Sequence, residues 1–181
     1  NYDLRLDYMP YNGGLLSVSW FYKDITDPIE YVQDLVNAFS FITPLNFPEG
    51  KLSGFEFETR QQMGYFWDTL QGFSIGGNAT FIDSEVTLPE SERANLANAG
   101  VDTKTRDMVG APDYLYNIYL SYDYEPFDTQ IGLFYTVKGD TLVVGAGNRN
   151  SHYVPDVYAT EFGTLNMSVS KKLGKHFILA F

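Results

Sequence analysis

The lengths of the connections between strand-like segments constrain this chain more than any other feature. Eight segments alternate apolar and polar residues with a period of two, which predicts strands. They are residues 2–10, 15–24, 52–65, 73–86, 114–124, 130–138, 162–173 and a last segment that begins at His176. The connections are alternately short and long, and the long ones exceed the roughly 12–15 residues that compact domains tolerate without a reason. All long connections therefore lie at one end of an up-and-down sheet.

The stretch LLSVSWFYKD, residues 15–24, shows what the alternation leaves open. Leu16, Val18, Trp20 and Tyr22 share one parity, whereas small polar residues occupy most of the other, with Phe21 as the exception. A soluble sheet buries its apolar face in a core and exposes the polar face to water. A membrane barrel does the reverse, with apolar side chains toward lipid and polar ones toward a wet lumen. Other features have to separate the two arrangements.

The amino-acid composition restricts the possible partners of the chain and leaves a membrane location open. The 181 residues suffice for one domain with a sizeable core. The net charge of −11 argues against nucleic acid as a partner, because phosphates attract basic surfaces. The chain has no cysteine and therefore neither disulfides nor thiolate metal ligands. No apolar run approaches the length of a membrane helix, but a membrane strand needs only about 9–11 residues, so hydropathy alone does not make the chain soluble.

The long connections favour the membrane arrangement. They cover residues 25–51, 87–112 and 139–161, and an outer-membrane barrel likewise has short turns at one end and long loops at the other. Many tyrosines lie near predicted strand ends, whereas aliphatic residues and Phe occupy the centres of the same faces, as expected for aromatic girdles. The sequence therefore predicts an all-β fold, an antiparallel up-and-down transmembrane β-barrel of which about eight strands are present.

Several stretches resemble a known family. They are GGLLSVSWFYKDITDPIE, GFEFETRQ, GAPDYLYNIYLSYDYEP, IGLFYTVKGDTL and YVPDVYATEFGTLNMSVSKKLGKHF. Together they span nearly the whole chain and are similar to the C-terminal barrel region of TonB-dependent outer-membrane receptors. The first stretch is the most specific, because it combines a hairpin, a strand, a Lys-Asp pair and a proline at the loop entry.

The resemblance implies a fold and a function. Members of the family have a barrel of about 22 strands around a plug and import scarce ligands, such as siderophores, cobalamin or glycans, across the outer membrane of Gram-negative bacteria. Residues 1–181 are then expected to be a single barrel segment without the plug domain, with both ends cut within strand patterns. The expected partners are outer-membrane lipid, lipopolysaccharide, the ligand and, through the missing N-terminal part, an inner-membrane energy-transducing complex.

Two other folds are compatible with the number of strands. A closed eight-stranded barrel would have an interior filled by side chains. A soluble all-β module that binds carbohydrate or another ligand would use aromatic residues such as Trp20 and Trp67 as platforms. In that module Leu16, Val18, Trp20 and Tyr22 would pack into a sealed core. The direction in which these side chains point therefore separates the module from the membrane barrel.

The polar face supplies the candidate ligand-facing residues of the lumen, which are Glu56, Glu58, Arg60, Asn78 and Asn117. Glu56 and Glu58 lie about 7 Å apart on one strand face, a separation that glycoside hydrolases also use. We interpret them instead as a polar pair whose charge Arg60 balances. The chain is therefore expected not to be an enzyme and to have no catalytic residues.

The outer loops hold the remaining candidates, Asp27, Glu30 and His152. Acidic residues gather at positions 24–30 and 85–92, but they lack the spacing of a calcium-binding loop and are expected to be solvated. The two histidines have no partners at metal-ligand spacing, so neither a metal nor a cofactor is expected. The glycine-rich GAGNRN, residues 145–150, is interpreted as a loop tip.

Overall fold

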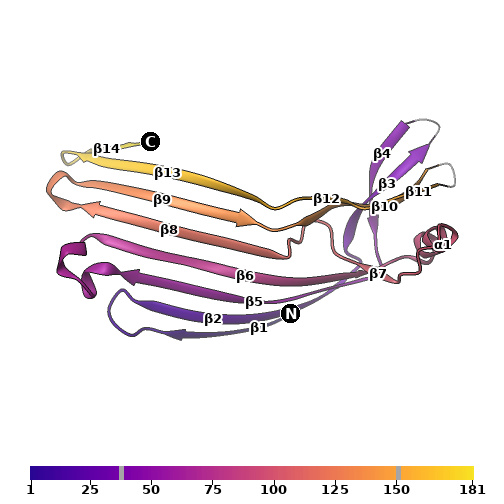
Figure 1. The fold of residues 1–181 in the computed structure, drawn as a ribbon, viewed down its shortest axis with the longest axis horizontal. Helices are drawn as coiled ribbons and strands as arrows, with labels where there is room; N and C mark the ends of the chain where they lie inside the picture. Colours follow the sequence, from indigo (N-terminus) through magenta and orange to yellow (C-terminus); the bar gives the residue numbers. More distant parts are fainter. Residues whose placement is uncertain (37–38, 150–151) are drawn as a thin grey trace.

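The chain forms a long wall of eight strands with a smaller folded body at one end (Figure 1). A computed structural model describes residues 1–36, 39–149 and 152–181. Neighbouring strands of the wall are all antiparallel. In spatial order they are β1 (Tyr2–Tyr8), β2 (Leu15–Thr26), β5 (Glu49–Gln62), β6 (Phe73–Thr87), β8 (Tyr114–Tyr124), β9 (Thr129–Lys138), β13 (Phe162–Leu173) and β14 (Phe177–Ala180).

The alternating segments predict these strands well, because a period of two over several residues fits only extended backbone. Segments 114–124 and 162–173 coincide with β8 and β13, and the others differ by a few residues at their ends. The wall is open: β1 and β14 form its two edges and do not pair with each other in the described ranges. The alternative of a closed eight-stranded barrel is therefore wrong for this structure.

The short connections lie together at the end of the wall opposite the folded body (Figure 1). Two of them contain 3₁₀ turns, namely η1 (Met63–Tyr65), η2 (Asp68–Leu70) and η3 (Glu125–Phe127). In the first connection the ladder already ends at the pair Tyr8–Leu16, which leaves more residues than a two-residue hairpin loop holds. The Asn12-Gly13 pair in the sequence predicts a type I′ turn, in which both central residues have positive φ. Gly13 has a positive φ of 93° but Asn12 does not, so this prediction is wrong.

The three long connections fold together at the other end into a body that we call the lid, residues 27–48, 88–113 and 139–161. Its elements are β3 (Ile29–Val36), β4 (Phe39–Asn46), α1 (Glu90–Asn98), β7 (Thr105–Arg106), β10 (Thr141–Arg149), β11 (His152–Val154) and β12 (Val157–Ala159). β10 is central, since it pairs antiparallel with β11 and β12 and parallel with β3, which in turn pairs with β4. The segments expected to be loops therefore contain regular structure.

The lid contradicts one interpretation of a motif. Residues 145–149 of GAGNRN belong to β10 rather than to a loop tip, and Asn150 lies outside the described residues. The helix α1 is short, with acidic residues in its first turn, where they favour the positive end of the helix dipole. Within the described ranges, no helix has the length and apolar character needed to cross a membrane.

The lid has a dry apolar core. Its buried members come from all three long connections and from the end of β6, and they are Val32, Phe47, Val86, Leu88, Leu96 and Ala146. Phe47 and Val86 are fully buried, and Leu96 is the side chain through which α1 joins the cluster. Burial of these apolar groups away from water holds three sequence-distant segments together.

Candidate functional site

The wall has one apolar face whose side chains are exposed. Leu16, Val18 and Trp20 are 46%, 38% and 37% exposed, whereas Ser17, which lies between them on the opposite face, is only 8% exposed. The polar face is thus the more enclosed one, and the apolar face points outward. The soluble alternative requires the reverse, so its expectation of a sealed core is wrong.

Aromatic residues bound the outward apolar face at both ends. In the row nearer the lid, four aromatic residues are direct neighbours across the strands: Trp20, Phe55, Phe81 and Tyr114. Near the turns the rings stack in succession, in the order Phe73, Tyr122, Tyr124 and Phe127. Phe73 and Phe81 are separated by about 26 Å along β6, at about 3.3 Å per residue. This spacing matches the apolar band of about 25 Å in outer-membrane barrels.

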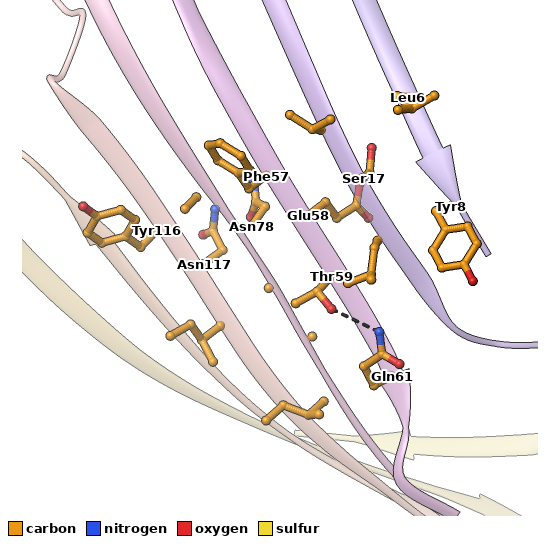
Figure 2. Close-up of a pocket in the computed structure, with 17 residues that line it drawn as sticks. Leu6, Tyr8, Ser17, Phe57, Glu58, Thr59, Gln61, Asn78, Tyr116 and Asn117 are labelled. Atoms are coloured by element: carbon orange, nitrogen blue, oxygen red, sulfur yellow. Dashed lines mark hydrogen bonds between the residues drawn. The ribbon is translucent and has the colours of Figure 1, made fainter. Parts of the chain in front are cut away.

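A hollow of about 790 Å³ lies in the middle of this band (Figure 2). Small residues create it: Gly77 pairs with Thr59 on one side and Ile118 on the other, and Ala79 lies between Phe57 and Tyr116. The lining comes from β1, β2, β5, β6 and β8. Its exposed surface is mostly apolar, although six polar residues also line it, namely Ser17, Glu58, Thr59, Gln61, Asn78 and Asn117. The exposed surface of the hollow therefore suits an apolar group better than a charged one.

The predicted lumen residues lie together on the enclosed, inward face. Glu58, Asn78 and Asn117 are direct neighbours in one row across β5, β6 and β8. Asn78 donates a hydrogen bond to Glu56 (3.1 Å), and Asn117 accepts one from Thr136 (2.8 Å). The row continues to both sides with polar residues, namely Asp7, Ser17, Thr136 and Thr164.

Charge balance on this face differs from the prediction. The guanidinium of Arg5, on β1, lies 2.8 Å from Glu58 and 2.8 Å from Asp7. Arg5 reaches across β2 because the residues beneath it, Ser17 and Ser19, are small. The cation that the structure places on Glu58 is therefore Arg5 rather than Arg60, which lies between Leu15 and Gly76 in the ladder.

The polarity of the two faces reverses above the aromatic row nearer the lid. On the outward side, Asp24, Lys51 and Glu85 are neighbours across β2, β5 and β6 and are all exposed. On the inward side, Val86 is fully buried and Gly50 is buried against lid residues. The strands thus follow the membrane pattern below this level and the pattern of a soluble protein above it.

The lid is attached to the inward side of the wall. Gly50 faces Met108 and Pro28 of the lid, since a Cβ on this glycine would lie 3.0 Å and 3.2 Å from their side chains. The amide of Met108 also donates a hydrogen bond to Ser84 on β6 (3.2 Å). The lid therefore leans over the polar face of the wall rather than over its lipid side.

A buried ion cluster lies where the three lid segments meet. Arg106 of the second segment is 7% exposed, and its guanidinium lies 3.5 Å from Glu30 of the first segment. The same guanidinium lies 3.0 Å from Glu92 on α1 and 3.7 Å from Asp156 of the third segment. Glu30, 1% exposed, also accepts a hydrogen bond from the amide of Val109 (3.2 Å). The three carboxylates that contact Arg106 thus come from the three different lid segments.

Packing fixes the guanidinium of Arg106. The ring of Phe47 lies 4.9 Å away in cation–π geometry. Any Cβ on Gly145 would overlap the guanidinium, so this position in β10 requires glycine. Gly147 is needed for a similar reason, because a Cβ there would overlap the backbone of Gln33 in β3.

Burial changes the acidity of the carboxylates in this cluster. Desolvation raises the pKa of Glu92 from its ordinary value of 4.5 to about 6, against the attraction of Arg106, and nearby Asp156 and Glu30 raise it further. Desolvation also raises the pKa of Glu30, although Val109 and Arg106 stabilise its charged form. Three carboxylates thus share one guanidinium, and two of them, Glu30 and Glu92, are largely buried.

The predicted outer-loop residues lie in different environments. Asp27 is exposed at the entry to β3, with a positive φ of 52°, and its carbonyl accepts a hydrogen bond from Asn46 (3.1 Å). Glu30 is buried on Arg106, and the expectation that the acidic residues are solvated is wrong for Glu30 and Glu92. His152 begins β11 opposite Arg149, and its side chain is not described. In the described ranges no group of three or more His, Cys, Asp or Glu side chains is arranged to hold a metal ion.

Arg106, Glu92 and Asp156 are the residues that sequence reasoning missed. Glu92 was noted only as one of several loop acids, and no motif joins the three. Pro89 followed by Glu90 and Glu92 is a helix-start pattern that indicates α1 and hence a folded rather than a free loop. The sequence carries no comparable signal for Arg106 and Asp156.

An apolar outward band, a polar inward face and a folded lid over that face define the wall of an outer-membrane β-barrel. The model of the family described as "TonB dependent receptor-like, beta-barrel" matches residues 1–181, so the chain belongs to this family. The protein is accordingly an outer-membrane protein, from a family of receptors and transporters rather than enzymes. No curated protein sequence matches the chain.

Solved structures with a similar fold include two bacterial receptors and a bacterial iron transporter. A mutant (G324V) of the ferric enterobactin receptor PfeA from Pseudomonas aeruginosa is 14% identical over 98% of this chain and 24% of its own, with a TM-score of 0.62. The iron transporter FrpB from Neisseria meningitidis is 10% identical over 94% and 23%, with a TM-score of 0.60. The siderophore receptor PirA from Acinetobacter baumannii is 16% identical over 95% and 25%, with a TM-score of 0.58. The chain thus spans about a quarter of each of these proteins.

Proposed function

We propose that the chain forms part of the barrel of a receptor that imports a scarce ligand by energy-coupled uptake. The observation that supports this most is the combination of a lipid-type outward face with a polar inward face covered by a lid. In this role Glu56, Glu58, Arg60, Asn78 and Asn117 line the path of the ligand, and Asp27 and His152 lie near its entrance. The energy comes from an inner-membrane complex that engages a separate N-terminal region and plug.

Siderophore, cobalamin and glycan are the ligand classes to be compared. The similar structures are those of a ferric enterobactin receptor, an iron transporter and a siderophore receptor. On this basis we place ferric siderophores first in the order of testing. The inward face offers carboxylates, amides and guanidinium groups, which suit a large polar ligand.

An uptake experiment tests the proposal. Cells that produce the membrane-embedded protein, and cells that lack it, are given radiolabelled ferric siderophores, cobalamin or oligosaccharides. We expect uptake of one class that depends on the protein and stops when an uncoupler collapses the proton gradient of the inner membrane. Uptake that persists after uncoupling would exclude energy-coupled import, and binding of no class would exclude the receptor function.

We place the outward face in contact with lipid acyl chains, which fill the hollow around Gly77 and Ala79. The exposed row of Asp24, Lys51 and Glu85 then lies at the level of lipopolysaccharide head groups, to which divalent ions can bridge the carboxylates.

The two tryptophans of the chain, Trp20 and Trp67, allow contact with the acyl chains to be measured by fluorescence. We expect lipids with brominated acyl chains to quench Trp20 fluorescence in a Trp67→Phe variant; lack of quenching would exclude lipid contact at Trp20.

A further inference from the structure

Strand pairing, hydrogen bonds and ion pairs join the three long connections to one another. β10 pairs with β3 across the third and first segments, and Gln33 donates a hydrogen bond to the carbonyl of Pro155 (3.0 Å). The hydroxyl of Tyr158 donates to Asp107 (2.9 Å), which joins the third segment to the second. All three segments meet at Arg106, through Glu30, Glu92 and Asp156.

We propose that Arg106 is a positioning residue that locks the three outer connections into one rigid lid, so that the lid opens and closes over the lumen as a single body. Arg106 contacts no ligand in this role; it acts through the carboxylates that it holds. Its buried guanidinium is confined between Phe47 and Gly145. It therefore cannot move toward the carboxylate of one segment without leaving those of the others. The role of this lid in admitting ligand rests on the proposed uptake function, whereas the locking itself does not.

The lock depends on a proton at Glu92. The charged groups that face Glu92 are Arg106 from β7, Asp156 from the third segment and Glu30 from β3. Formally these four groups carry three negative charges and one positive charge, and a proton on Glu92 reduces the excess. Because the pKa of Glu92 is raised to about 6 in the folded lid, its stabilising contribution is complete below pH 4.5 and is lost as the pH rises through about 6.

Distances between spin labels test the lock. The chain contains no cysteine, so introduced cysteines can be labelled selectively. Ile42, Ala97 and Val157 are exposed sites, one in each lid segment, and they are replaced by cysteine two at a time. The membrane-embedded protein is measured by pulsed electron resonance at pH 5 and pH 8. We expect one narrow distance distribution for each pair at pH 5 and broader distributions at pH 8, where Glu92 has lost its proton. In Arg106→Gln we expect loss of the narrow distribution for all pairs together.

Matched variants separate locking from simple destabilisation. Arg93→Gln is the control, because it removes a partly buried arginine on α1 that forms no ion pair in the described part of the chain. This variant is expected to keep the narrow distributions. Glu92→Gln mimics the protonated carboxyl and is expected to abolish the broadening between pH 5 and pH 8. Arg106→Lys keeps the charge but not the planar fork, and is expected to restore order only partly.

Each outcome decides the proposal. Narrow distributions that survive in Arg106→Gln, or pairs that broaden independently of one another, would overturn the single rigid lid. A pH response that persists unchanged in Glu92→Gln would overturn the role of the proton. Because the label distances need no ligand, a protein that fails to import any ligand can still show the locked lid, and the two proposals therefore fail separately.

Discussion

Strand β6 crosses both the wall and the lid, and its side chains exchange roles along the way. Within the membrane band, Phe81 faces outward and is exposed, whereas Asn78 faces inward and is hydrogen-bonded. A few residues further on, Glu85 is the exposed outward residue and Val86 is the fully buried inward one. The backbone continues without a break, and the environment on each side changes. Apolar side chains thus point outward in the wall and inward in the lid, as expected if the proposed lipid surrounds the wall and water surrounds the lid.

The same contrast governs charge. In the wall, Arg5 and Glu58 form an ion pair with side chains that are 45% and 30% exposed toward a wet lumen. In the lid, Arg106 and Glu30 are 7% and 1% exposed and are enclosed by an apolar core. Water competes with the first pair but not with the second, so breaking the second leaves charge without solvation. The two regions can therefore be compared by the same substitution made in each.

Truncation of a phenylalanine gives the largest expected difference. Phe47→Ala removes a fully buried ring from the lid core and from Arg106, and we expect it to destabilise the lid by about 3–5 kcal/mol. Phe57→Ala, in the outward face of the wall, is expected to cost much less, because lipid chains are as apolar as the side chain they replace. Hydrogen exchange of lid and wall amides in the membrane-embedded protein measures both. Equal effects would contradict the distinction between the two regions.

A charge placed on either face of β13 tests the wall. Leu165→Arg puts a guanidinium into the middle of the apolar band, and we expect it to destabilise the barrel by about 2–4 kcal/mol. Thr164→Arg places the same group one residue away, on the inward face in the row that contains Asp7, Glu58 and Asn117, where water can solvate it. Denaturant titration in lipid vesicles gives the two free energies of unfolding. If Thr164→Arg were the more damaging, the assignment of the two faces would be reversed.

Gly145→Ala tests the packing of the lid at a single carbon atom. The added methyl group overlaps the guanidinium of Arg106 and forces it away from its carboxylates, at a cost of about 1–3 kcal/mol to the lid. In an Arg106→Gln background the same methyl group should cost less, since the clash is with the side chain that has been removed. A double-mutant cycle, followed by hydrogen exchange of lid amides, measures this coupling. Additive effects would show that Gly145 is required for another reason.

The wall could be predicted from the sequence because every strand there has an apolar face and a polar face. That difference imposes strict alternation, for example through Tyr114–Tyr124, and the ends of β8 follow from it. Motif resemblance added the family, which the chain was found to match over its full length. The prediction of a type I′ turn failed because the ladder stops before the Asn-Gly pair.

The lid could not be predicted in the same way. Its strands are short and partly buried on both faces, so alternation is lost. Residues 145–149 of β10 were therefore interpreted as part of a glycine-rich loop tip. Glu30, Arg106 and Asp156 come together only through tertiary packing, and no spacing in the sequence brings them into one pattern. Glu30 does lie in the first long connection, but it is buried rather than solvated as expected. Glu56, Glu58, Asn78 and Asn117 were placed on one face correctly, although their contact with a ligand is still a prediction.

The smallest expected effect comes from the ion pair of the wall and completes the comparison. Arg5→Gln removes the partner of both Asp7 and Glu58, yet we expect no measurable change in the unfolding midpoint, because water solvates the two carboxylates that remain. Arg106→Gln, the same change in the lid, removes the cation that three carboxylates share, two of them largely buried, and should release the lid. Unfolding midpoints at low and high salt provide the measurement. A strong, salt-independent loss in Arg5→Gln would mean that the inward face is dry at this level, and the wet lumen inferred from its polar row would have to be abandoned.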